Sequence, residues 1–308
     1  MRCLLMDFGA SFIKIASFDG NSVLSTQRRA SLFNNKDKVT KNEVYDFLNG
    51  VLNDYPDYDV VFSCCIMGGG FKQGVYHSWK SSVKDHDGID LISGLFVDQS
   101  SFHEHQDHNF SGDNKVKILG NLFGKTFFSS LADTECVRRS IALCDNEYIL
   151  NLGTGSQILS KTYTHSFIPS GRSLNVFYNF FKQFGFDMYE YFNQISFDQM
   201  KQKKIQFDLN VFPESHLYSD GGCISKIVEG HFTKENFFTS LFACYLDQYV
   251  KIFKDLQPSK IYLTGGISKR YPVIKDYLSE SLNTDVVLVQ DNTDDTIVGL
   301  KNIALEVL

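Results

Sequence analysis

The sequence predicts an α/β protein made of two lobes, and three observations lead to this fold class. The chain has 308 residues, about twice the ~150 residues of a typical domain. Its C-terminal part alternates predicted strands and helices, the order typical of a parallel sheet. Residues 7–15 and 151–160 also share a strand, a turn of small residues and a returning strand. We therefore expect one lobe at residues 1–145 and a second at residues 146–308.

The first lobe begins with short predicted strands. Residues 2–6 form an apolar run, and residues 12–18 alternate in part between apolar and polar side chains. Residues 23–28 follow Asp19-Gly20-Asn21, which is a strong hairpin signal. The other predicted elements of this half are a helix at 41–54, a buried strand at 60–67 that ends at three glycines, mostly loop from 71 to 117, and a helix at 129–143.

The second lobe is richer in predicted helix. A strand at 148–152 runs into a glycine turn and a hairpin partner at 157–162. A long amphipathic helix covers 234–256, with Thr233 as its N-cap and Pro258 beyond its end. The other predicted elements are helices at 174–184, 188–195, 271–282 and 294–305, and strands at 260–263 and 286–289.

Charge and cysteine content narrow the class of protein. A net charge of −6, with 43% hydrophobic residues, excludes intrinsic disorder and argues against a broad basic surface for nucleic acid or anionic membrane. Seven cysteines without a C-x-x-C pair favour a reducing compartment over a disulfide framework. No signal peptide or apolar run long enough for a membrane span is evident. We expect a cytoplasmic protein with neither nucleic acid nor membrane as partner.

The first of three glycine turns joins the first two predicted strands. Asp7 ends the first strand, Gly9 permits a tight turn, and Ser11 adds a hydroxyl. A carboxylate at the end of a buried strand is costly without a cation or a metal shell. One interpretation is a turn whose amides face phosphate, with Asp7 holding Mg²⁺ through water. The other is an ordinary hairpin, and the segment alone does not decide.

The other two turns lie in the second half. Gly153-Thr154-Gly155-Ser156 follows an apolar strand, and successive amides in such a turn form an anion nest. It lacks the lysine and the following helix of a P-loop. Thr264-Gly265-Gly266-Ile267-Ser268 joins a strand to a helix, and a Gly-Gly pair lets a flat ring approach the backbone. Each turn alone also fits a plain hairpin or strand–helix loop.

In this order, the three turns resemble those of the actin/hexokinase/heat-shock ATPase superfamily. Within it, the sequence is similar to the FGGY carbohydrate kinases, nearest the sedoheptulokinase and xylulokinase branch. The family's D-x-G-T/S-x-x-x-K/R turn is matched by Asp7, Gly9 and Lys14, with Ala10 at the first hydroxyl position. The resemblance implies two actin-like, ribonuclease H-like lobes with a nucleotide cleft between them, and ATP and Mg²⁺ as cofactors.

The resemblance also implies roles for individual residues. Asp7 would orient Mg²⁺. Asp133, 20 residues before Gly153 in the sequence, stands where the family has its catalytic aspartate, which accepts the proton of the sugar hydroxyl. A simple helix N-cap is the alternative for Asp133. The implied ATP contacts are Gly9, Ser11, Lys14, Gly153, Thr154, Gly155, Ser156, Gly265, Gly266 and Ser268.

The expected substrate is a small-molecule sugar or polyol. Met67 and Gly68 stand where the family has Q-M-H-G, although the Gln and His are absent. Trp79 either stacks on the sugar or belongs to the core, and Asp133 contacts the reacting hydroxyl. The chain is short for this family, and the missing length falls mainly between Met67 and Lys117, which implies a reduced sugar pocket. We expect a monomer or a homodimer.

Two functions from different classes follow. The first is ATP-dependent phosphorylation of a sugar or polyol hydroxyl. The second is a non-catalytic ATP-binding pseudokinase or an actin-like regulatory protein, which the short first lobe favours. The final helix also favours it, because residues 295–301 keep only Gly299 of the family's small residues. A kinase of the same superfamily with a non-sugar substrate is a third candidate.

Overall fold

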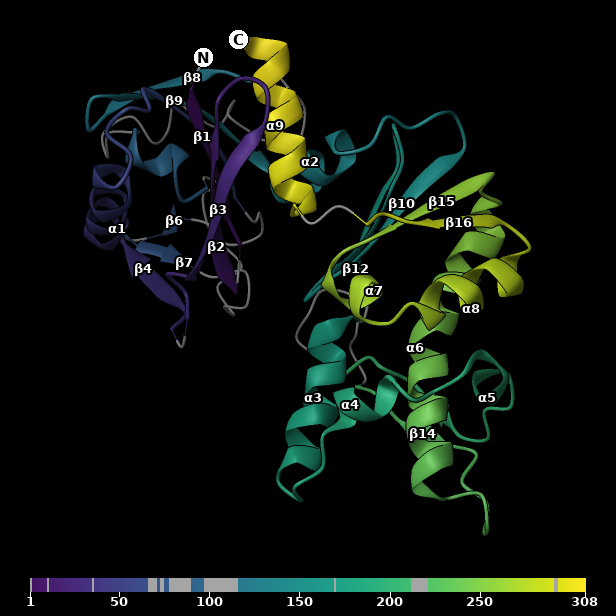
Figure 1. The fold of residues 1–308 in the computed structure, drawn as a ribbon. Helices are drawn as coiled ribbons and strands as arrows, with labels where there is room; N and C mark the ends of the chain where they lie inside the picture. The colour runs from purple at the N-terminus through teal and green to yellow at the C-terminus, as the bar shows by residue number, and fades with distance from the viewer. Residues whose placement is uncertain are drawn as a thin grey trace. The chain divides into compact units, whose positions relative to one another are not determined.

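The computed structural model divides the chain into two compact units. Unit 1 consists of Met1–Ala142 and Asn292–Leu308, and unit 2 of Leu143–Asp291; Figure 1 shows their helices and strands. None of the helices in the described part of the chain is long and apolar enough to cross a membrane. The structure describes residues 2–9, 11–34, 36–65, 71–72, 75–77, 90–96, 116–168, 170–211, 221–290 and 293–308.

Unit 1 is built on a mixed six-stranded sheet in the order β3-β2-β1-β5-β9-β8. The strands β1, β5 and β9 are parallel, whereas β2, β3 and β8 pair antiparallel with their neighbours. Parallel strands bring their carboxyl ends to the same edge of a sheet. The strands are β1 (Cys3–Phe8), β2 (Phe12–Phe18), β3 (Val23–Ala30), β5 (Val60–Cys65), β8 (Ile118–Leu122) and β9 (Lys125–Ala132).

Both faces of this sheet are covered, as the fully buried strand β1 requires. On one face, Leu4 and Met6 pack against the buried side of α1 (Lys41–Asn53). Thr40 and Glu43 form a capping box at the N-terminus of this helix. Three short strands form a small sheet: β4 (Lys38–Thr40), β6 (Phe71–Lys72) and β7 (Val75–His77). The other described elements of this unit are the 3₁₀ turn η1 (Ser93–Leu95) and α2 (Asp133–Arg139).

The opposite face is covered by α9 (Asp295–Val307), which packs beside α2 (Figure 1). Its side chains Ile297, Leu300 and Ile303 share a core cluster with Cys3 and Leu5 of β1. The sequence assigned this helix to the second lobe, within residues 146–308. It joins unit 1 instead, because its apolar side buries the alternate side chains of β1 that would otherwise face water.

The helix predicted at residues 129–143 is shorter than expected. Residues as far as Ala132 belong to β9, because they pair in parallel with β5, with Cys64 opposite Leu131. The helix starts only at Asp133 and ends at Arg139. Pairing within the sheet therefore prevails over helical spacing at this point.

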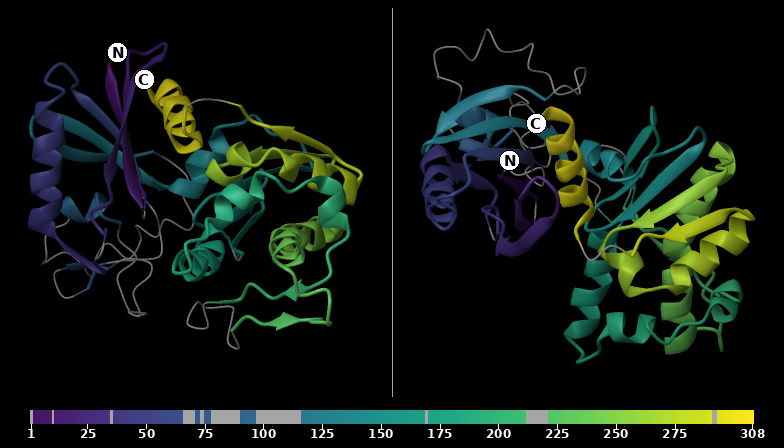
Figure 2. Two further views of the ribbon diagram at one scale, coloured as in Figure 1. Left: turned by 60° about the horizontal axis from the view of Figure 1, so that its bottom comes forward. Right: turned by 45° about the horizontal axis from the view of Figure 1, so that its top comes forward.

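Unit 2 is built on a five-stranded sheet in the order β12-β11-β10-β15-β16, with β10, β15 and β16 parallel. The long helix α6 (Lys234–Leu256) packs against this sheet, and its buried side chains belong to the same hydrophobic core (Figures 1 and 2). The strands are β10 (Glu147–Leu152), β11 (Ser156–Leu159), β12 (Thr164–Ile168), β15 (Lys260–Thr264) and β16 (Asp285–Leu288), with a short pair β13 (Gln206–Phe207) and β14 (Ile224–Ser225). The helices are α3 (Gly171–Lys182), α4 (Met188–Phe192), α5 (Phe197–Lys201), α6 (Lys234–Leu256), α7 (Gly266–Arg270) and α8 (Val273–Leu282).

The two units repeat one topology. In each unit, the first three strands pair antiparallel in sequence order. A later strand then pairs parallel with the first, and the next one pairs parallel with that later strand. The weak similarity between residues 7–15 and 151–160 thus reflects equivalent hairpins, β1–β2 and β10–β11. The α/β prediction with two lobes is confirmed.

Candidate functional site

Asp7 lies at the carboxyl end of β1, between two polar neighbours that the strand register fixes. The register pairs Asp7 with Lys14 of β2 and with Cys64 of β5, so the three side chains share one face of the sheet. The Lys14 ammonium lies 2.8 Å from Asp7 Oδ2, and the Cys64 thiol donates to Asp7 Oδ1 at 3.5 Å. Asp7 is 2% exposed, so the ammonium provides the charge compensation that a buried carboxylate needs.

The N-terminus of α9 completes this cluster. Lys14 Nζ also lies 2.8 Å from Asp294 Oδ1, and the Thr296 hydroxyl lies 2.6 Å from both Asp7 Oδ2 and Asp294 Oδ1. Burial alone would lower the pKa of Lys14, but the carboxylates of Asp7 and Asp294 raise it above its ordinary value. Sequence reasoning missed Asp294 and Thr296. Their only signal is an Asp N-cap pattern, which many helices share.

Asp133 stands just beyond the end of β9, at the same edge of the sheet as Asp7. It is the first residue of α2, while Ala132 occupies the N-cap position without a side-chain hydrogen bond, so Asp133 is not the cap itself. Its Oδ1 accepts from the Thr134 amide at 2.7 Å. Burial first, and then the nearby charge of Asp7, raise the pKa of Asp133 to about 7.

The turn between β1 and β2 is closed tightly. The Gly9 amide donates to the Phe12 carbonyl at 3.1 Å, and a Cβ on Gly9 would lie 2.9 Å from that oxygen. The Ser11 carbonyl accepts from the Ser31 amide. Lys14, predicted to contact ATP, is instead held by two carboxylates, so it is not free to meet a phosphate in this arrangement.

The turn between β10 and β11 directs amides outward. Its carbonyls at Gly153 and Thr154 accept from the Gly171 and Arg172 amides at the start of α3, at 3.2 and 3.1 Å. In a trans peptide the following N–H points away from the carbonyl, so the Thr154 and Gly155 amides point away from α3. Neither amide has an acceptor among the described residues. The backbone of this turn therefore fits an anion.

The Ser156 hydroxyl faces the protein interior. Ser156 is 2% exposed, and its oxygen accepts from the Tyr249 hydroxyl of α6 at 2.6 Å. The predicted contact of this side chain with ATP therefore does not fit the structure. The hydroxyl fastens the turn to α6 instead, because a buried hydroxyl must find a partner inside the protein.

The turn after β15 requires its first glycine. Gly265 has φ +90°, and a Cβ there would lie 2.7 Å from the carbonyl carbon of Leu152 and closer still to its oxygen. Space around Gly266 is open. Ser268 is fully buried, with its hydroxyl 2.6 Å from the Thr264 carbonyl and 2.8 Å from that of Gly265. Ser268 therefore supports the loop, contrary to the predicted contact with adenosine.

The repeated topology gives unit 2 a neutral counterpart of the Asp7 cluster. Asn151 occupies in β10 the register position that Asp7 occupies in β1, two residues before the turn glycine. Its amide donates to Gln157 Oε1 at 3.0 Å, and the Thr264 hydroxyl donates to its Oδ1 at 3.4 Å. Equivalent strand positions thus carry the charged pair Asp7 and Lys14 in unit 1 and the uncharged pair Asn151 and Gln157 in unit 2.

The donors around Asp7 do not form a direct Mg²⁺ site. Mg²⁺ requires near-octahedral oxygen ligands, but both Asp7 oxygens already accept from Lys14, Thr296 or Cys64. In the part of the chain that the structure describes, no three His, Cys, Asp or Glu side chains are placed to hold a metal ion. A role of Asp7 through water stays a prediction. The predicted substrate residues Met67, Gly68 and Trp79, together with Ala10, lie outside the described residues.

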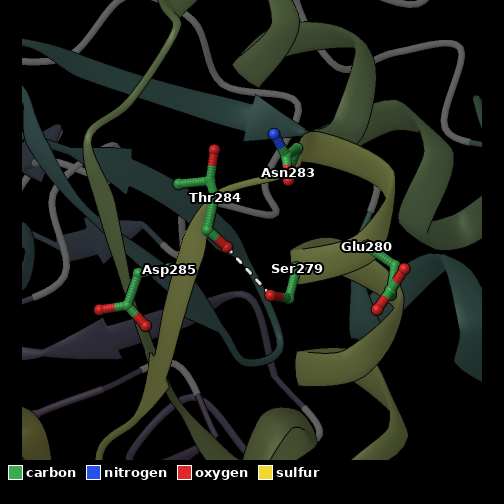
Figure 3. Close-up of a pocket in the computed structure, with 5 residues that line it drawn as sticks. All are labelled: Ser279, Glu280, Asn283, Thr284 and Asp285. Atoms are coloured by element: carbon green, nitrogen blue, oxygen red, sulfur yellow. Dashed lines mark hydrogen bonds between the residues drawn. The ribbon is translucent and has the colours of Figure 1, made fainter.

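A separate hollow lies on unit 2, at the end of α8 and the start of β16 (Figure 3). The Ser279 hydroxyl donates to the Thr284 carbonyl at 3.0 Å across it. No predicted site residue lines this hollow, whose walls are Ser279, Glu280, Asn283, Thr284 and Asp285.

Comparison with solved structures identifies the fold. The xylulose kinase of Lactobacillus acidophilus matches with a TM-score of 0.70 at 12% identity, over 100% of this chain and 90% of that one. The chain has the two-lobed actin-like fold of the sugar kinases. The ROK hexokinase of Thermus thermophilus matches with a TM-score of 0.51 at 11% identity, over 100% of both chains.

A further match is not a kinase by name. The activator of the 2-hydroxyisocaproyl-CoA dehydratase from Clostridium difficile, with bound ADPNP, has a TM-score of 0.52 at 13% identity, over 99% of this chain and 95% of that one. No protein-family model and no curated protein matches the sequence. The comparisons therefore show the fold, and the chemistry must be argued from the residues.

Proposed function

We propose that this protein transfers the γ-phosphate of ATP to a hydroxyl of a sugar or polyol, as an FGGY-like carbohydrate kinase. The observation that carries the proposal is Asp133, a half-buried residue at the same sheet edge as Asp7, whose pKa is raised to about 7. A general base works best when its pKa lies near the operating pH. Structural similarity to proteins named xylulose kinase and gluconate kinase supports the same conclusion.

In this proposal, Asp133 accepts the proton of the acceptor hydroxyl as its oxygen attacks the γ-phosphate. The bond between the γ-phosphorus and the bridging oxygen breaks, and ADP leaves. The negative charge of Asp7 contributes by keeping the proton affinity of Asp133 high. Phosphoryl transfer depends mainly on positioning and charge neutralisation, and the fixed strand ends of unit 1 supply the positioning.

The nucleotide would be held by backbone groups. The outward amides of Thr154 and Gly155 suit phosphate oxygens, and the open space at Gly266 suits the approach of an adenosine ring. Mg²⁺ would enter with ATP as one co-substrate, with phosphate oxygens and water as most of its ligands. None of the seven cysteines, all of which the structure describes, forms a disulfide, which supports a cytoplasmic site of action. The proposed oligomeric state is a monomer or homodimer.

A non-catalytic ATP-binding protein of the pseudokinase or regulatory class is the second candidate. The specific observation in its favour is that Lys14 and Asp7 bind each other, so that neither is free for nucleotide or metal. The similarity to a dehydratase activator with bound ADPNP also fits this class.

The test is ADP release from Mg-ATP in the presence of a panel of ketoses, heptoses and polyols. We expect one acceptor to stimulate release, and Asp133→Asn to lower that stimulated rate by about 10²- to 10⁴-fold. The matched control is Asp198→Asn, since Asp198 is exposed in α5. A rate for Asp133→Asn within a few-fold of wild type would show that Asp133 is not the base. Bound ATP without stimulation by any acceptor would favour the second candidate.

A further inference from the structure

Two side chains that lie 282 residues apart in the sequence, Lys14 and Thr296, meet at one oxygen of Asp7. Lys14 Nζ and Thr296 Oγ1 lie 2.8 and 2.6 Å from Asp7 Oδ2. Asp294 Oδ1 lies 2.8 Å from the same ammonium and 2.6 Å from the same hydroxyl. The ammonium therefore has three oxygens around it, those of Asp7, Asp294 and, at 3.5 Å, Thr296.

The two Asp7 oxygens are treated differently by these contacts. Oδ2 receives an ion pair and a hydroxyl. Among the described residues, Oδ1 has only the Cys64 thiol at 3.5 Å, and a thiol is a weak donor. A hydroxyl has one proton, so Thr296 cannot donate to Asp7 and Asp294 at once. The Lys14 charge is what allows both carboxylates to stay beside that hydroxyl.

Apolar and backbone contacts outside this cluster also hold α9 in place. The helix is fixed by Ile297, Leu300 and Ile303 in the core and by Gly299 against the Cys136 backbone. Thr296 is 7% exposed, and valine has nearly its shape, so loss of the hydroxyl leaves no cavity. The hydroxyl and the Asp294 carboxylate are thus available for a role beyond packing.

We infer that Thr296 and Asp294 are positioning residues for the phosphoryl transfer proposed above: by holding Lys14 and one oxygen of Asp7, they fix the Asp7 carboxylate relative to Asp133. This inference rests on the proposed function. Thr296 acts through Asp7, and Asp294 acts through Lys14. Neither residue is taken to touch the substrate.

The test compares Thr296→Val, which removes the hydroxyl, with Thr296→Ser, which keeps it. The matched control is Thr26→Val, because Thr26 is exposed in β3 of the same unit. We expect Thr296→Val to lower kcat by about 10- to 100-fold, the usual cost of slight misplacement, with the acceptor KM nearly unchanged. Thr296→Ser should recover most of kcat, and Asp294→Asn should resemble Thr296→Val.

Two outcomes would overturn the inference while the proposed function stands. One is wild-type kcat in Thr296→Val. The other is an equal loss in the Val and Ser variants, which would indicate a packing role. If wild type binds Mg-ATP but no acceptor stimulates transfer, the proposed kinase activity and this inference both fail. Thermal melting of each variant verifies that it is folded.

Discussion

Gly299 and Gly50 offer a test of the helix packing in unit 1, because alanine should act in opposite directions at the two positions. Both glycines lie inside helices, Gly299 in α9 and Gly50 in α1. A Cβ on Gly299 would lie 2.8 Å from the Cys136 Cα and closer still to its carbonyl oxygen, whereas a Cβ on Gly50 would meet nothing within 4 Å. The contact at Gly299 is with backbone, which cannot rotate away as a side chain can.

The expected magnitudes follow from these surroundings. In an open helix, alanine is more stable than glycine by about 0.5–1 kcal/mol, so Gly50→Ala should stabilise by that amount. Gly299→Ala must separate α9 from α2, and overpacking of this kind costs about 1–3 kcal/mol or more. For a unit of this size, 3 kcal/mol corresponds to a fall in Tm of roughly 6–12 °C.

Urea and thermal denaturation followed by circular dichroism would measure both effects. We expect Gly50→Ala to raise the free energy of unfolding and Gly299→Ala to lower it. A Gly299→Ala variant as stable as wild type would refute the close crossing of α9 and α2, and with it the placement of the last helix in unit 1.

Three other outcomes are expected. Gly265→Ala should destabilise unit 2 by roughly 2 kcal/mol, because φ is +90° and the Leu152 carbonyl blocks a Cβ; unchanged urea denaturation would contradict this. Lys14→Met should cost about 3 kcal/mol by stranding buried Asp7, and adding Asp7→Asn should recover part of it in a double-mutant cycle. Burial and the charge of Asp7 raise the pKa of Asp133 to about 7, so the folded protein keeps a proton that the unfolded chain loses near pH 4. The free energy of unfolding therefore falls as pH rises from about 4 to 7. Asp133→Asn should flatten that slope in urea denaturation across this range, and an unaltered slope would count against the raised pKa.

The fold class and the glycine turns around the candidate site can be predicted from the sequence alone. Strand periodicity and the order of elements predicted two α/β lobes, and the pattern at Asp7-Phe8-Gly9 repeats as Asn151-Leu152-Gly153. These features are local, because a buried strand must be apolar and a tight turn needs glycine. Asp133 as the candidate general base also follows from the sequence, through its spacing from Gly153 and the family resemblance.

Which polar groups contact one another, and which stay available for a ligand, depends on the tertiary fold. The pattern of α9 shows an apolar side, but not that it packs on unit 1 and brings Asp294 and Thr296 to Asp7. Ser156 and Ser268 look like ligand hydroxyls in the sequence, yet both face the interior. Long-range contacts decide such matters, because the availability of a polar atom depends on what the rest of the fold places beside it.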